Sequence, residues 1–417
     1  MKILMSHPTG NANVHAAALG FSNAGILGEL NTAIAMFPGT ILDRLSRIGL
    51  LSQLRRRRFD PALQHITKIF PWSEVGRLVA SKAGIRSLTK HEAGIFCIDA
   101  VYQSIDRRVM KRLNKAHKQG IQGIYAYEDG ALQSFIKAKT LGLQCLYDLP
   151  IGYWRTARKL LENEKEKWPA WKSTLTGFLD SDIKLARKDE ELRLADKIFV
   201  ASKFTANTLK DFPGNLAPIE IIPYGFPSVI NSRNYQTLKN RRLKLLFVGS
   251  LSQRKGIANL FEAVKGFDRH IELTVVGRRV SGDCKALNNA LAKHQWISAL
   301  PHSEVLQLMR VHDVLVFPSL FEGFGLVISE AMATGTPVIT TDRTAGPDLL
   351  QHGQNGWLIE AGSTEALRSA IEEILHNPKM IESAGRQAMD TAGKRPWHVY
   401  GAELAQAIMK QVNDLKF

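Results

Sequence analysis

The 417 residues are too many for one ordinary hydrophobic core, so we expect two domains. With 45% hydrophobic and 23% charged residues and no apolar run of roughly 18 residues, the composition excludes a disordered chain and a membrane-spanning helix. The net charge of +16 belongs to residues 1–242, which hold 37 Lys and Arg against 21 Asp and Glu, whereas residues 243–417 hold 18 of each.

Residues 1–8 contain too short an apolar run for a signal peptide and predict a first strand. Short apolar runs then alternate with helical stretches, a pattern typical of parallel α/β layers. In the first half we predict strands at residues 123–127, 144–148 and 197–202, a helix from 130 to 139, and one long charged helical region over 154–195 in which residues 162–167 form a solvated face.

The basic residues are densest between positions 44 and 118 and include four consecutive arginines at 55–58. Such a field favours an anionic partner, either acidic lipid or an anionic acceptor. Nucleic acid is not expected, because this half has no recognisable nucleic-acid-binding module. Residues 41–54 mix apolar and basic positions at helical spacing, and both a membrane-surface helix and a core-facing helix with a basic outer face stay open.

The second half begins after a linker at residues 229–242, which is rich in polar residues and has little periodicity. The three cysteines, Cys97, Cys145 and Cys284, are scattered, which predicts buried, reduced thiols in a cytosolic protein. In this half we predict strands at 243–248, 273–276, 314–317, 338–340 and 356–359, helices at 256–264 and 326–333, and a long amphipathic helix at 397–415.

Two carboxylates bracket the most informative segment, residues 321–330. Glu322 precedes a Gly-x-Gly turn that joins a buried strand to a helix, and Glu330 lies about two helical turns further on. Free amides and the positive end of the helix dipole make such a junction an anion site. Because carboxylates suit sugar hydroxyls, a phosphate with a sugar at each end, as in a nucleotide sugar, fits this spacing.

A second strand–turn–helix junction, residues 248–256, carries two cations. Gly249 lets a backbone approach closely, and Lys255 stands just before the helix, where it can meet a diphosphate. Arg254 and Ser250 can add donors. In a doubly wound sheet both junctions lie at the carboxyl ends of strands, where ligands bind.

These motifs resemble those of retaining nucleotide-sugar glycosyltransferases of the GT-B fold, family 4 (glycosyl transferases group 1). The resemblance covers most of residues 195–400, including 195–202, 222–225, 249–256, 322–338 and 346–356. It implies an α/β protein with two Rossmann-like, doubly wound domains facing a cleft. The implied layout is a basic acceptor domain at 1–228, the linker at 229–242, a donor domain at 243–395, and a helix at 396–417 that crosses back to the first domain.

The resemblance also implies roles for individual residues. Glu330 would hold the nucleotide ribose and Glu322 the hydroxyls of the donor sugar. Lys255, with Arg254, would neutralise the leaving diphosphate as the glycosidic bond breaks. The backbone of Gly323, Phe324, Gly325, Leu326 and Val327 would cradle the sugar or the diphosphate.

The chain departs from the family pattern at three places. Ser250 stands where many members have Arg, and the pair Tyr147-Asp148 replaces a His-Asp pair, which leaves Asp148 as the candidate catalytic contact of the first domain. The glycine loop near the N-terminus is reduced to Gly10, the residue expected nearest the donor diphosphate.

The resulting hypothesis is an enzyme that transfers a hexose, with retention and without metal or cofactor, from a nucleotide diphosphate sugar to a hydroxyl of a glycan or lipid-linked glycan. The resemblance favours a UDP-sugar as donor, with GDP-mannose next. The protein is expected to be cytoplasmic, and a peripheral position on the inner face of the membrane stays open. A nucleotide-sugar epimerase of the same fold and a non-catalytic scaffold stay as alternatives. Asp180-Ser181-Asp182 lies in a charged helical stretch and is not expected to hold a metal.

Overall fold

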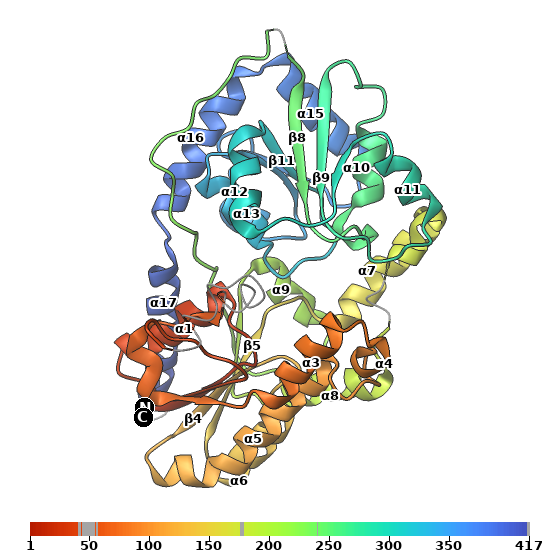
Figure 1. Cartoon of the computed structure of the whole chain (residues 1–417). Helices are drawn as coiled ribbons and strands as arrows, with labels where there is room; N and C mark the ends of the chain where they lie inside the picture. Colours follow the sequence, from red (N-terminus) through yellow and green to blue (C-terminus); the bar gives the residue numbers. More distant parts are fainter. Residues whose placement is uncertain (41–42, 44–54, 56, 176–178, 240, 415–417) are drawn as a thin grey trace.

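The computed structural model describes residues 1–40, 43, 55, 57–175, 179–239 and 241–414, and within them the chain forms two sheets with helices (Figure 1). The helix expected at 41–54, whether on a membrane surface or facing the core, falls outside the described residues, apart from Asp43. None of the helices in the described part combines the length and apolarity that crossing a bilayer requires.

The first sheet has seven parallel strands in the order β3-β2-β1-β4-β5-β6-β7. This order runs outward in both directions from β1, as expected of a doubly wound fold. The predicted first strand is β1, and β2 and β3 lie in a stretch for which no strand was predicted. The strands are β1 (Ile3–Ser6), β2 (Leu27–Thr32), β3 (Thr67–Ile69), β4 (Gly123–Tyr127), β5 (Gln144–Leu149), β6 (Lys197–Val200) and β7 (Ile219–Ile221).

The second sheet has six parallel strands in the order β10-β9-β8-β11-β12-β13. Of its central strands, β11 is fully apolar and β8 is apolar except for Lys244, as expected where helices cover both faces of a sheet. The strands are β8 (Leu243–Val248), β9 (Ile271–Val276), β10 (Gln295–Ile297), β11 (Val314–Phe317), β12 (Val338–Thr341) and β13 (Gly356–Ile359). The predicted α/β class with two Rossmann-like units is confirmed.

Helices connect the strands of each sheet. The first unit contains α1 (Ala12–Asn23), α3 (Trp72–Lys82), α4 (Arg86–Thr89), α5 (Ile98–Lys118), α6 (Leu132–Thr140), α7 (Trp154–Lys167), α8 (Asp182–Leu194) and α9 (Lys203–Thr208). The second contains α10 (Ile257–Ala263), α11 (Lys285–Leu291), α12 (His302–Val311), α13 (Leu326–Ala333), α14 (Gly346–Leu349), α15 (Thr364–His376) and α16 (Lys379–Gly393). All three cysteine thiols are buried and free, as predicted.

The last helix, α17 (Trp397–Asp414), returns to the first unit and packs along α1 (Figure 1). The two helices approach closely because Gly20 and Gly401 face each other. A Cβ at Gly20 would overlap the backbone of Gly401, and a Cβ at Gly401 would overlap the carbonyl oxygen of Ala16. The predicted crossing helix is therefore confirmed.

The region 154–195 is not one helix, as the sequence suggested. It divides into α7, a short 3-10 turn η3 (Pro169–Thr174), and α8, whose N-terminus is capped by Ser181. Pro169 ends the first helix because it cannot continue the hydrogen-bond ladder. The expected solvated face of α7 is also wrong at one residue, since Glu164 is buried and accepts from Gln253 Nε2 of the second unit at 2.9 Å.

Candidate active site

The turn after β11 sits where the two units meet. The carbonyl oxygen of Gly323 accepts hydrogen bonds from the hydroxyls of Ser202 and Thr205 in the first unit, at 2.6 and 3.0 Å. A Cβ at Gly323 would overlap the carbonyl oxygen of Pro150. Gly325 adopts the left-handed φ of 86° at the N-terminus of α13, which favours glycine. The glycines thus serve close approach and turn geometry.

The amides that follow this turn are available to a ligand. Within the described part of the chain, the N–H groups of Phe324, Gly325, Leu326 and Val327 donate to no acceptor. The first amides of a helix, together with its dipole, form an anion site. The turn can therefore hold a phosphate or a sugar hydroxyl, as the sequence predicts.

Glu322 is held by two cations from the turn after β8. Its Oε2 contacts the ammonium of Lys255 and lies 3.5 Å from Nη1 of Arg254. The same Nη1 donates to the carbonyl of Phe321 at 2.8 Å. The structure thus brings together the two junctions that the sequence singled out separately.

Lys255 is almost buried beneath this contact. Its Nζ lies 4.8 Å from the centre of the Phe317 ring. Burial and the Arg254 guanidinium lower the pKa of Lys255, whereas the Glu322 carboxylate against Nζ favours the charged ammonium. Gly256 has a φ of 68°, and a Cβ at this position would overlap the carbonyl oxygen of Pro318. Glycine here therefore lets the turn after β8 lie directly against the turn after β11.

Gly249 and Ser250 follow β8 directly, at the carboxyl edge of the sheet. The Gly249 amide donates to Val276 at the end of β9, at 3.0 Å. Ser250 has a backbone role in the turn, since its carbonyl accepts from the Ser252 amide at 2.9 Å. Both belong to the same turn as Arg254 and Lys255, so they lie at the same edge of the sheet as the paired cations.

Glu330 lies on α13 and pairs with a residue that the sequence did not point to. Its Oε1 is 2.9 Å from Nε2 of His302, at the start of α12. This hydrogen bond raises the pKa of His302 above its ordinary value. The two residues belong to different helices and no motif joins them, so only the fold could reveal the pair.

Asp148 lies at the carboxyl end of β5 within a buried cluster of tyrosines. The Tyr125 hydroxyl donates to its Oδ2, and burial raises the pKa of Asp148 to about 7. Tyr224, which also faces Asp148, has its ring 5.0 Å from that of Phe324. Tyr224 therefore links Asp148 to the glycine turn. Among the described residues, Asp148 makes no direct contact with Glu322.

Gly10 lies in the loop after β1, beside His15, whose ring a Cβ at this position would overlap. Asn13, in the first turn of α1, donates to the hydroxyl of Tyr224 at 3.3 Å. The loop is thereby tied to the same aromatic cluster that surrounds Asp148. Gly10 and Asp148 share one end of the first sheet, which faces the second unit.

A buried charged group that sequence reasoning missed lies beside Asp148. Glu128 follows β4, its amide donates to the Asp148 carbonyl at 3.1 Å, and its Oε1 is 3.3 Å from Nζ of Lys188. Burial raises the pKa of Glu128 to about 7. Its position directly after a buried strand was the available signal, because the carboxyl ends of neighbouring parallel strands meet at one edge.

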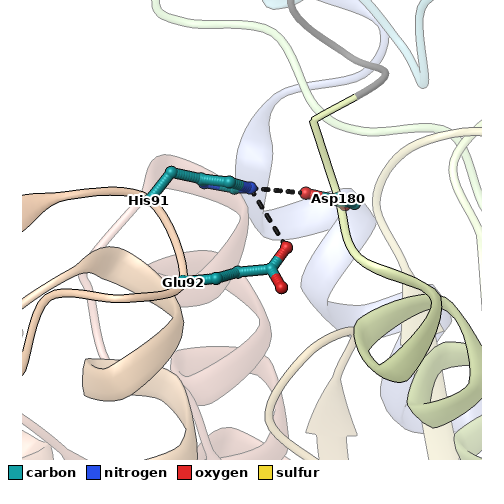
Figure 2. Close-up of side chains that lie close together, drawn as sticks. All are labelled: His91, Glu92 and Asp180. Carbon is teal, nitrogen blue, oxygen red and sulfur yellow. Dashed lines mark hydrogen bonds and ion pairs between the residues drawn. The ribbon is translucent and has the colours of Figure 1, made fainter.

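One cluster in the described residues has the residue types of a metal site. Figure 2 shows His91, Glu92 and Asp180, whose ligand atoms lie within 4.8 Å of one another. Asp180 already accepts from the ammonium of Lys184 at 2.9 Å, and Ser181 donates its amide and hydroxyl to Glu92. These contacts satisfy the carboxylates, so the cluster reads as an ion-pair network that joins two loops.

Of two pockets in the described residues, one adjoins the candidate site and the other lies apart from it. A polar one of about 320 Å³ is lined by Arg343, Glu164, Lys167 and Glu360 and adjoins Glu322, whose amide donates to the Arg343 carbonyl at 3.1 Å. A larger apolar one of about 670 Å³ lies between α1 and α17, outside the residues predicted to bind the donor.

Comparison with known proteins identifies the second unit. Residues 229–391 match the family model described as Glycosyl transferases group 1. This segment is a glycosyl transferases group 1 domain. The match contains Lys255, Glu322 and Glu330 and stops before α17.

Curated relatives match part of the chain. An uncharacterized glycosyltransferase of Methanocaldococcus jannaschii is 30% identical over 206 residues, which is 49% of this chain and 56% of the relative. The phosphatidyl-myo-inositol mannosyltransferase of Mycobacterium leprae is 30% identical over 167 residues, 38% of this chain and 44% of the relative. The chain thus spans about half the length of the curated relatives it matches.

Solved structures match over nearly the whole chain. Sucrose-phosphate synthase from Thermosynechococcus elongatus superposes with a TM-score of 0.68 at 17% identity, covering 99% of this chain and 100% of the other. Anabaena HepE, in complex with UDP, gives 0.62 at 16% identity, covering 98% and 100%. At these identities the likeness shows the fold, and it confirms the two-domain GT-B architecture.

Proposed function

We propose that this protein is a retaining glycosyltransferase of family 4 that transfers a hexose from a nucleotide diphosphate sugar to an acceptor hydroxyl. The observation that carries the proposal is the convergence of Arg254, Lys255 and Glu322 beside the open amides of the 323–327 turn. Two cations and a row of amides suit a diphosphate, and the carboxylates Glu322 and Glu330 stand on either side for hydroxyl groups.

In this proposal the donor displaces contacts that the structure shows. The ammonium of Lys255 forms an ion pair with the diphosphate in place of Glu322. The Glu322 carboxylate then accepts hydrogen bonds from hydroxyls of the donor sugar. The ribose replaces His302 at Glu330. As the glycosidic bond breaks, charge grows on the diphosphate, and Lys255 and Arg254 stabilise it without a metal or cofactor.

The first domain would supply the acceptor side. Gly10 would lie near the diphosphate, and Asp148 would approach the donor sugar from the first sheet when the domains close. A uridine donor is supported by HepE, which was solved in complex with UDP and with UDP-glucose, whereas the mannosyltransferase among the relatives keeps GDP-mannose as the next candidate. The positive first half supports an anionic glycan or lipid-linked glycan as acceptor.

Calorimetry with UDP, GDP and ADP tests the donor site, with Glu330→Ala as the decisive variant. Micromolar binding of one nucleotide that is lost in the variant supports the proposal, and unchanged binding in Glu330→Ala contradicts it. Glu304→Ala, on an exposed turn of α12, is the matched control. Incubating the protein with donor alone distinguishes the epimerase, which needs no acceptor, and binding without any turnover distinguishes the scaffold.

A further inference from the structure

Large apolar side chains that are strongly exposed gather in one part of the molecule. Among the described residues, seven such side chains are more than 60% exposed, and six lie on α3, on the 91–98 segment or in residues 179–183, which lead into α8. We call these six the docking face; Trp72 and Ile183 are 79% and 84% exposed. The members are Trp72, Val79, Ile95, Ile98, Leu179 and Ile183.

The three segments that carry the docking face are held together. Gly76 of α3 lies against the ring of Phe96, and α3 also packs on α4 and α5. The Ser181 amide donates to Glu92 at 3.0 Å, and His91 bonds Asp180 at 2.9 Å (Figure 2). Figure 1 shows α3, α4 and α8 grouped on the same side of the first unit. The three segments that carry the six exposed side chains therefore belong to one surface region.

Basic residues accompany the apolar ones. Around the docking face, in residues 67–99 and 179–188, the sequence has eight Lys and Arg against five acidic residues. Four of the acidic side chains are engaged within the protein: Glu74 with Arg77, Glu92 with Ser181, Asp99 with Arg187 and Asp180 with Lys184. Lys82, Arg86 and Lys90 are exposed. The whole net charge of the chain belongs to the half that contains this surface.

We propose that the docking face binds the surface of an anionic phospholipid bilayer. An exposed tryptophan with several isoleucines can insert at head-group depth, while neighbouring lysines and arginines meet the lipid phosphates. Soluble surfaces seldom leave so many large apolar side chains together. The inference goes beyond the proposed function, because it depends on neither the donor nor the chemistry at Glu322.

The docking face lies near the end of the first sheet that faces the second unit. Its 91–98 segment and α8 border the end of the first sheet that carries Glu128, since α8 also supplies Lys188 to that carboxylate. A bilayer bound here would lie beside the acceptor half of the protein. A lipid-linked acceptor could then reach the cleft without leaving the membrane.

The experiment is sedimentation of the full chain with phosphatidylcholine vesicles, with and without phosphatidylglycerol. We expect binding only with the anionic lipid, weakened by salt, and reduced about tenfold or more by the double variant Trp72→Ser with Ile183→Ser. Val311→Ser on α12 is the matched control, because Val311 is the seventh exposed side chain and lies in the second unit. It should bind like the original protein.

Equal binding to neutral and anionic vesicles, or equal binding by the double variant and the original, would overturn the proposal. Nucleotide calorimetry on the same samples separates the two proposals, since the double variant should keep its nucleotide affinity. Loss of nucleotide binding in every sample contradicts the donor site alone, whereas loss of vesicle specificity contradicts the docking face alone.

Discussion

The ammonium of Lys255 lies against the carboxylate of Glu322, although the two residues are 67 positions apart in the chain. The contact joins the turn after β8 to the turn after β11 at the carboxyl edge of the second sheet. It neutralises Glu322 before any ligand arrives. In the proposed function, the donor exchanges this ion pair for contacts with phosphate and sugar.

Replacing Lys255 by Met should strongly reduce transfer. Because the leaving diphosphate loses its nearest cation, we expect a fall of about 10²- to 10³-fold in kcat/KM and weaker nucleotide binding, measured by initial rates and calorimetry. Lys265→Met is the control, since Lys265 is exposed and pairs only with Glu262 in the part of the chain described. Equal rates for the two variants would show that Lys255 takes no part.

Nucleotide affinity should depend on the protonation of His302. The bond to Glu330 raises the pKa of His302, so the charged form and its ion pair dominate as the pH falls through that value. We expect nucleotide affinity to weaken between pH 8 and 6, values that bracket an ordinary histidine pKa of about 6.5, and to vary less in His302→Ala. Calorimetry across this range checks it, and parallel pH profiles for both proteins would rule it out.

Asp148 should make stability fall as the pH rises. Burial raises its pKa from 3.8 to about 7, so the folded protein holds a proton that the unfolded chain releases. The unfolding free energy should therefore decline between about pH 4 and 7, by an amount of order 1 to 4 kcal/mol from this group.

Urea unfolding of the original protein and Asp148→Asn at several pH values measures this contribution. The variant keeps an acceptor for the Tyr125 hydroxyl and cannot ionise, so it should gain stability relative to the original above pH 7. Glu128 contributes a decline of the same sign and stays in both proteins. A pH-independent difference between the two would contradict the buried, protonated state of Asp148.

Gly323→Ala should disturb the junction of the two domains. The added methyl group would overlap the Pro150 carbonyl, so we expect a loss of about 1–3 kcal/mol in unfolding free energy, with reduced transfer. Gly282→Ala is the control, because a Cβ there meets no atom within 4 Å. Thermal unfolding and activity of both variants test the idea, which fails if Gly323→Ala behaves like the control.

Much of the second unit could be predicted from local pattern. The bounds of β8, β11, β13 and α13 agree with the sequence prediction, because each is a mostly apolar segment bounded by turn residues. The elements of the first unit were harder to predict from the sequence, and β2 and β3 were missed. The break between α7 and α8 was also missed, because a charged composition continued through it while Pro169 ended the helix.

The sequence by itself determined the fold class, the two junctions that would meet at a strand edge, and the concentration of positive charge in the first half. These depend on composition, apolar periodicity and the backbone needs of glycine and proline, which are local properties. Tertiary structure alone decided that Lys255 rests on Glu322, that His302 pairs with Glu330, and that Asp148 lies among tyrosines. Such contacts join side chains from separate elements, and their distances are set by packing that no local pattern records.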